Sequence, residues 1–207
     1  MAGWLFTIGA VVAAVLLGLL LLSIVSPRFR IWPTLGDGSW QGYVWWPLFR
    51  SLNVLCFAVA LADRAPYLGL PGWLRLSALA LLAGSIALFV YAFKVLGRDN
   101  SYCAAEGLVT SGIYQWTRNP QNAMLIVVHG CLALAADSAS AYTLCGAMMA
   151  VYAVMVLAEE PWLAAVYGEP YRTYCRDVPR FFNWRKVAGA RWAPRIRGQR
   201  SWPPRRR

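Results

Sequence analysis

Long runs of apolar residues alternate with shorter polar segments along most of the chain. The first run, residues 4–25, contains no charged residue and is long enough, at ~1.5 Å per residue, to cross a ~30 Å hydrocarbon core as a helix. No basic residue precedes this run, and it is longer than the apolar part of a typical signal peptide, so a retained helix is favoured over a cleaved leader. Further apolar runs predict four more spans, at 47–62, 73–96, 122–136 and 141–158. We therefore expect an all-α fold, a polytopic membrane helical bundle with about five transmembrane helices.

The segments between these spans have turn-forming and interfacial compositions. Residues 26–46 are rich in Pro, Gly and Trp, which is typical of a surface loop with a Trp belt. Arg50, near the start of the second span, is expected to extend toward the interface. Residues 63–72 and 137–140 form short connections, and 97–121 form a longer polar loop. Pro161 predicts that the last helix kinks or stops there.

Composition and charge narrow the class of protein. The chain of 207 residues is 59% hydrophobic and 14% charged, which excludes an ordinary soluble globular protein. Twelve of its 20 Lys and Arg residues lie from Arg172 onward, so the net charge of +11 is a topology signal and does not favour nucleic-acid binding. The positive-inside rule places the N-terminus outside and the C-terminus in the cytoplasm, with the segments 97–121 and 158–182 on one cytoplasmic face.

The same analysis divides the chain into three parts. Residues 1–96 form three N-terminal transmembrane helices, and 97–182 form a ligand-binding loop, the last two transmembrane helices and a C-terminal capping helix. Residues 183–207 form a basic tail that is expected to lie disordered on the inner leaflet. Five scattered cysteines without a C-x-x-C pair predict neither a disulfide framework nor a metal site. His129, the single histidine, is expected to be a hydrogen-bonded packing residue rather than a catalyst.

Two polar groups of residues stand out against this background. Arg118 and Asn119 precede Pro120, where a helix begins and its backbone donors favour an anion. Glu159 and Glu160 form an acidic pair at the end of the last span, where an unpaired carboxylate is costly. Together these groups could bind a zwitterionic ligand that carries a carboxylate and a cation. The alternative is an ordinary helix end with both carboxylates solvated in the headgroup layer.

Five motifs follow one another along the chain: LVTSGIY at 108–114, RNP at 118–120, EE at 159–160, YGEPYRTY at 167–174 and VPR at 178–180. This ordered set resembles the C-terminal signature of the isoprenylcysteine carboxyl methyltransferase and phospholipid methyltransferase superfamily of integral membrane enzymes. The resemblance covers roughly residues 97–182. It implies a membrane methyltransferase that uses S-adenosylmethionine and receives a lipophilic methyl acceptor from the bilayer through a gap between helices.

The resemblance also implies roles for individual residues. Tyr114, Arg118 and Asn119 would line the cofactor pocket, and Gly112 would allow a close approach of the backbone. Glu159 and Glu160 would bind the ammonium group or the ribose hydroxyls of the cofactor. The full expected cofactor set is Val109, Gly112, Tyr114, Arg118, Asn119, Asn122, Glu159, Glu160, Tyr171 and Arg180. Arg118 and Glu160 are the expected catalytic residues, with Glu160 as the base if one is needed and Glu159 as the alternate.

Departures from the family pattern leave alternatives open. The Arg-His-Pro that is common in the family is Arg-Asn-Pro here, and Asn119 cannot titrate. Asn122 replaces a frequent tyrosine, and Leu157 and Ala158 stand where the isoprenylcysteine enzymes often have an arginine. The acceptor could be a phospholipid amine, an isoprenylcysteine carboxylate, a small thiol or another lipophilic molecule, and the oligomeric state is open. Two other hypotheses remain. One is a non-catalytic membrane protein that keeps the fold. The other is an NADPH-dependent reductase of the sterol reductase type, in which the phosphate groups of NADPH would be bound by Arg98, Arg118, Arg172, Arg176 and Arg180.

Overall fold

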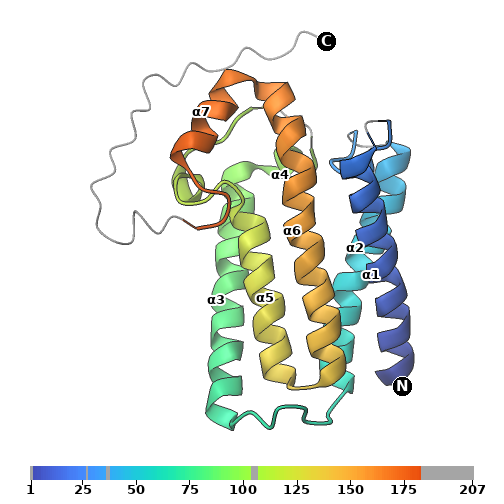
Figure 1. Ribbon diagram of the computed structural model, residues 1–207. Coiled ribbons are helices and arrows are strands. Elements are labelled where there is room, and N and C mark those ends of the chain that lie inside the picture. The colour runs from blue at the N-terminus through green and yellow to red at the C-terminus, as the bar shows by residue number, and fades with distance from the viewer. Residues whose placement is uncertain (1, 27, 36–37, 104–106, 183–207) are drawn as a thin grey trace.

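The computed structural model describes residues 2–26, 28–35, 38–103 and 107–182, so the predicted basic tail at 183–207 lies outside the described residues. Five long helices stand side by side (Figure 1): α1 (Ala2–Val25), α2 (Trp40–Ala62), α3 (Gly72–Leu96), α5 (Pro120–Ala136) and α6 (Ala139–Tyr167). Three short elements lie beyond one end of this bundle: α4 (Arg98–Ser101), the 3₁₀ helix η1 (Gly112–Gln115) and α7 (Glu169–Asp177). The described part of the chain contains no strand, which confirms the predicted helical bundle.

Four of the long helices, α1, α2, α3 and α6, are long and apolar enough to cross a membrane. The fifth, α5, is apolar but has only 17 residues, and it packs between α3 and α6. The expectation of about five spans is therefore met by four long helices and one shorter apolar helix. The side of the membrane on which each end lies stays a prediction.

Two predicted boundaries are wrong, and both errors involve proline. The structure begins α2 at Trp40 instead of residue 47, with Ser39 accepting a hydrogen bond from the Gly42 amide at 3.2 Å and Pro47 lying inside the helix. Likewise, α6 does not end at residue 158 or stop at Pro161 but continues to Tyr167, while the alternative of a kink at Pro161 stays a prediction. A proline removes one backbone donor, and neighbouring helices can stabilise a transmembrane helix that contains it. In α6 that support includes Leu163, Ala164 and Tyr167, which pack against α7.

The buried core lies mainly among α1, α2, α5 and α6. Its largest buried side chains include Leu16, Trp45, Leu144, Met148 and Tyr152. Two polar side chains inside the bundle make hydrogen bonds: Tyr152 Oη donates to Asn53 Oδ1 at 2.8 Å, and His129 Nδ1 lies 2.8 Å from the Leu125 carbonyl oxygen. These contacts confirm His129 as a hydrogen-bonded packing residue. The Trp45 indole Nε1 and His129 Nε2 are buried without a partner among the described residues.

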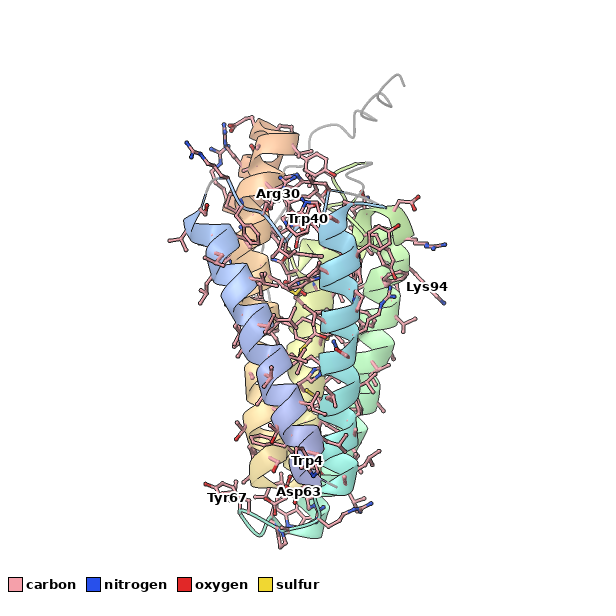
Figure 2. All side chains as sticks on the ribbon, turned by 90° about the vertical axis from the view of Figure 1, so that its right-hand side faces the viewer. Trp4, Arg30, Trp40, Asp63, Tyr67 and Lys94 are labelled. Atoms are coloured by element: carbon pink, nitrogen blue, oxygen red, sulfur yellow. The ribbon has the colours of Figure 1, made fainter. Side chains whose placement is uncertain are left out.

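At the end of the bundle opposite the short helices, Asp137 connects the end of α5 with the segment between α2 and α3. Its carboxylate accepts hydrogen bonds from the amides of Leu68 at 3.0 Å and Leu70 at 2.8 Å. Arg75 donates from Nε to the Ala135 carbonyl at 2.8 Å and so satisfies the end of α5. Figure 2 shows Trp4, Asp63 and Tyr67 at this end, and Arg30, Trp40 and Lys94 at the other.

Candidate active site

The two polar segments singled out in the sequence meet at one end of the bundle. The elements α4 and η1 and the start of α5 lie at the same end of the bundle as α7, which follows α6 (Figure 1). This arrangement confirms that the segments 97–121 and 158–182 can build one site. That this end faces the cytoplasm remains a prediction from the distribution of basic residues.

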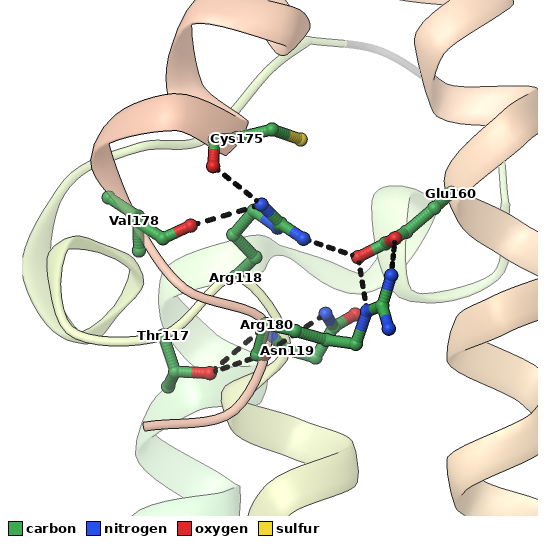
Figure 3. Close-up of polar contacts among 7 residues, drawn as sticks. All are labelled: Thr117, Arg118, Asn119, Glu160, Cys175, Val178 and Arg180. Carbon is green, nitrogen blue, oxygen red and sulfur yellow. Dashed lines mark hydrogen bonds and ion pairs between the residues drawn. The ribbon is translucent and has the colours of Figure 1, made fainter. Parts of the chain in front are cut away.

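Glu160 on α6 is held between two arginines from different segments (Figure 3). Arg118 Nη2 lies 2.7 Å from Glu160 Oε1, and Arg180 contributes Nε to Oε1 at 3.0 Å and Nη2 to Oε2 at 2.5 Å. The side chains of Arg118 and Glu160 are only 10% and 16% exposed. Hydrogen bonding to Glu160 raises the pKa of the Arg180 guanidinium above its ordinary value. Glu160 is thus neutralised by protein cations.

Arg118 also holds the end of α7. Its Nη1 donates to the carbonyl oxygens of Cys175 at 2.9 Å and Val178 at 3.1 Å, and its backbone amide donates to the Pro179 carbonyl at 3.0 Å (Figure 3 shows the side-chain bonds). The carbonyls of the last turn of a helix and of its C-cap lack intrahelical partners, so a guanidinium suits them. Arg118 therefore holds the C-terminal segment against the start of α5.

Thr117 and Asn119 extend this attachment to Arg180. Thr117 Oγ1 donates to the Arg180 carbonyl at 2.9 Å and accepts from the Asn119 amide at 3.1 Å. Asn119 Nδ2 donates to the same Arg180 carbonyl at 3.2 Å. The asparagine that departs from the family pattern thus uses its amide as a hydrogen-bond donor to the C-terminal segment.

A cavity of about 300 Å³ lies beside this ion-pair cluster. Its wall combines residues from α2, α3, η1, α5, α6 and α7 with Trp32 from the α1–α2 connection. Glu159 lines this cavity and lies against the Trp32 indole. In the described part of the chain Glu159 makes no ion pair, whereas its neighbour Glu160 makes two. The acidic pair is therefore divided: Glu160 is paired with two arginines and does not line the cavity, whereas Glu159 lines the cavity and has no ion pair among the described residues.

The cavity separates the expected cofactor residues into two groups. Seven of them line it: Val109, Tyr114, Arg118, Asn119, Asn122, Glu159 and Tyr171. Gly112, Glu160 and Arg180 do not. Gly112 has φ +59°, which favours glycine, and a Cβ there would meet Tyr91 Oη and Val95 Cγ1 at 3.4 Å, so this glycine allows a close approach to α3. Arg180 pairs with Glu160, and Glu160 pairs with Arg118, which lines the cavity.

Several lining residues were not expected from the sequence. They are aromatic and come from α2, α3, α6 and two connecting segments: Trp32, Trp46, Phe49, Phe89, Phe93, Tyr102 and Tyr152. The Trp-rich composition of 26–46 was a signal, but it was interpreted as an interfacial belt. Trp32 instead packs inward, with 5% exposure and its ring centroid 5.3 Å from that of Trp45.

Tyr174 ties α7 to η1. Its Oη donates to the Tyr114 carbonyl at 2.6 Å, and burial raises the pKa of both tyrosine hydroxyls, so both remain protonated donors at neutral pH. We expect Tyr174→Phe to lower the free energy of unfolding by about 1 kcal/mol, the net value of one buried hydrogen bond. In a thermal unfolding experiment this corresponds to a fall of about 2–4 °C. Tyr67→Phe, at the opposite end and 63% exposed, is the control; an equal fall in both variants would contradict a specific role of the Tyr174 bond.

Comparison with known families supports the resemblance drawn from the motifs. Residues 73–170 match the family model described as phospholipid methyltransferase, a family within the integral membrane methyltransferase superfamily. The matched segment runs from α3 to the start of α7 and includes Tyr114, Arg118, Glu159 and Glu160. Comparison with curated proteins and with solved structures finds no match. The family match and the apolar helices support a multi-pass membrane methyltransferase that acts on lipids.

Proposed function

We propose, from the match of residues 73–170 to the phospholipid methyltransferase family, that this chain transfers a methyl group from S-adenosylmethionine to the amine headgroup of a phospholipid. The observation that carries the proposal is the placement of Glu159. It lines the aromatic cavity and has no ion-pair partner in the described chain. A carboxylate in such a place at a membrane boundary indicates a cationic ligand.

The residues of the cavity fit this donor. S-adenosylmethionine carries an ammonium, a carboxylate and a sulfonium cation. Glu159 can accept the ammonium, and the rings of Tyr114, Tyr167 and Tyr171 can face a cation. Arg118 also lines the cavity, so its guanidinium is the cation of the ion-pair cluster nearest to a ligand carboxylate bound there.

The donor supplies a methyl group on a positively charged sulfur, which leaves without needing a proton. The protein must therefore position the acceptor in line with the methyl group and exclude water. The aromatic wall performs the exclusion, and the Glu160 cluster holds Arg118 and α7 in place around it. A protonated amine must lose a proton before it attacks. Glu159 is the carboxylate among the described residues of this cavity, and its second oxygen, the one that does not bind the ammonium of the donor, can accept that proton.

The helix packing offers the acceptor a route from the bilayer. The cavity is lined by Trp46 and Phe49 on α2 and by Phe89 and Phe93 on α3. In the described chain α3 packs extensively on α5, but α2 and α3 make almost no contact with each other. The side of the cavity between α2 and α3 is therefore where lipid tails can remain in the membrane while the headgroup enters.

The NADPH hypothesis finds less support at this site. A dinucleotide with a 2′-phosphate needs several cations in its pocket. The five arginines that could fill that role are Arg98, Arg118, Arg172, Arg176 and Arg180. Arg118 lines the cavity but is paired with Glu160, as is Arg180. Arg172 and Arg176 face Glu169 on the exposed side of α7, and Arg98 does not line this cavity.

Ligand-dependent thermal stability of the detergent-purified protein tests the proposed donor. S-adenosylmethionine and S-adenosylhomocysteine at 100 times their dissociation constants should each add about 2.7 kcal/mol to the free energy of unfolding. NADPH, at the same concentrations, should add nothing. Stabilisation by NADPH alone would move the assignment to the reductases. No response to any of the three would favour a protein that keeps the fold without the activity.

A further inference from the structure

Arg50 is a cation inside a membrane-spanning helix and outside the segment that matches the family. It lies roughly three turns into α2. Asn53 lies one turn further along α2 and forms a hydrogen bond with Tyr152 on α6. Tyr152 in turn lies about two turns deeper in the bundle than Glu159. Arg50 therefore lies at a depth just below that of the Glu159 carboxylate. A charged residue at such a depth indicates a function unless it is paired, and no ion pair of Arg50 exists within the described chain.

The Arg50 side chain extends toward the end of the bundle that holds the cavity. Its guanidinium carbon lies 5.5 Å from the ring centroid of Trp46, one turn nearer that end. That this end of α2 lies at the membrane interface stays a prediction. The guanidinium is held on one side by the indole, and its donors remain available to a ligand.

Beyond Arg50 lies a second cavity, of about 390 Å³, with a different lining from the first. It is formed by the start of α2 and by α4, and its charged residues are Arg50, Arg98 and Asp99. Neither Arg98 nor Asp99 makes an ion pair in the described chain, and all three side chains are exposed. Two guanidinium groups and one carboxylate leave this cavity with a net positive charge.

The two cavities are adjacent and share part of their walls. Trp46, Arg50 and Tyr102 line both of them, and the rings of Trp46 and Tyr102 lie 4.9 Å apart. A ligand held by Arg50 therefore lies at the boundary between a positively charged cavity and the cavity that contains Glu159. A phosphodiester joined by a two-carbon spacer to an amine has this arrangement of charges.

We propose that Arg50 and Arg98 bind the phosphate group of the phospholipid acceptor and so direct its amine into the cavity of Glu159. This inference rests on the proposed function and adds a recognition site that selects phosphate-bearing lipids. Guanidinium groups are suited to phosphate because their donors match its oxygens. Asp99 opposes the binding, because its charge repels the same oxygens.

The test measures lipid binding without the methyl donor. The detergent-purified chain is titrated with dihexanoyl phosphatidylethanolamine, with dihexanoylglycerol and with inorganic phosphate. Binding is followed by the change in tryptophan fluorescence, to which Trp46 contributes. We expect the phospholipid to bind at least tenfold more tightly than the diacylglycerol. Arg50→Gln and Arg98→Gln should each weaken phospholipid binding by about tenfold or more, which is the scale of one charge-assisted hydrogen bond.

Two further variants keep the test decisive. Lys94→Gln removes a cation at the same end of the bundle that lines neither cavity, and it should leave phospholipid binding unchanged. Asp99→Asn should tighten binding, a gain that misfolding cannot mimic. Unchanged binding in Arg50→Gln and Arg98→Gln, or equal binding of the diacylglycerol, would overturn the proposal. Inorganic phosphate binding as tightly as the phospholipid would reduce the site to a general anion site and overturn its role in lipid selection.

The result is separable from the test of the methyl donor. If S-adenosylhomocysteine stabilises the protein but phospholipid binding does not depend on Arg50, this inference is overturned and the proposed function stands. Phospholipid binding that depends on Arg50, without any response to the adenosyl compounds, would overturn the proposed function and leave a lipid-phosphate site.

Discussion

Glu159→Gln is expected to abolish methyl transfer and to weaken binding of S-adenosylhomocysteine by about 10- to 100-fold. The reason is that the substitution keeps the shape of the side chain but removes the charge that faces the cavity, and a hydrogen bond to a charged group contributes about 1.5–3 kcal/mol. The affinity is measured by calorimetry, and methyl transfer by incorporation of labelled methyl groups into added phosphatidylethanolamine. The melting temperature without ligand should stay close to that of the native chain, because Glu159 makes no ion pair in the described chain.

Glu160→Gln is the matched control, one residue away and with the opposite expected pattern. It removes the charge that both Arg118 and Arg180 contact, so the melting temperature should fall. The remaining folded protein should bind S-adenosylhomocysteine with an affinity near that of the native chain. If Glu160→Gln lost affinity at unchanged stability and Glu159→Gln did not, Glu160 would be the ligand-binding carboxylate and the assignment of that role to Glu159 would be wrong.

Arg118→Met is expected to be the most destabilising single change at the site. It leaves the carbonyls of Cys175 and Val178 without their donor and removes one of the two cations on Glu160. Removing one partner of a largely buried ion pair costs about 3–5 kcal/mol, and the 10% exposure of Arg118 favours the lower value. The melting temperature should fall by about 6–12 °C, and binding of S-adenosylhomocysteine should be lost with it.

Two controls make this result specific to the position. Arg118→Lys should also fail, because an ammonium cannot contact Glu160 and two carbonyls in the planar geometry of a guanidinium. Arg176→Met removes a different arginine whose partner Glu169 is 63% exposed, and exposed pairs contribute about 0–1 kcal/mol, so its melting temperature should hardly change. A stable Arg118→Met protein would show that α7 is held mainly by packing of Tyr171 and Tyr174.

The sequence identified the helices more reliably than their ends. Runs of apolar residues predicted all five long helices because burial in lipid requires a continuous apolar stretch. The starts and stops were assigned from prolines and tryptophans, and these residues can also lie within a membrane helix when neighbours support it. Pro47 and Pro161 are the two cases, and at Pro161 the extended helix carries the residues that hold α7.

The site was predicted as a set of residues but not as an arrangement. Arg118 and Glu160 were expected to bind opposite charges of one ligand, whereas the structure pairs them with each other. Neighbouring residues on a helix point about 100° apart. The motif alone therefore could not show that Glu159 faces the cavity and Glu160 faces the arginines. Trp32 and Arg50 could not be assigned to the site either, because their approach depends on how α2 packs against the rest of the bundle.

The attachment of α7 has a consequence for the order in which the protein is made. Arg118 leaves the ribosome long before residues 175–180, which supply three carbonyl acceptors for it and the second cation for Glu160. Until that segment has been synthesised, the helices α3, α5 and α6 can insert and pack, but the wall beside Glu159 lacks its final support. The membrane bundle and the binding site are thus completed at different times, and a chain released before Val178 would insert into the membrane without acquiring a finished site.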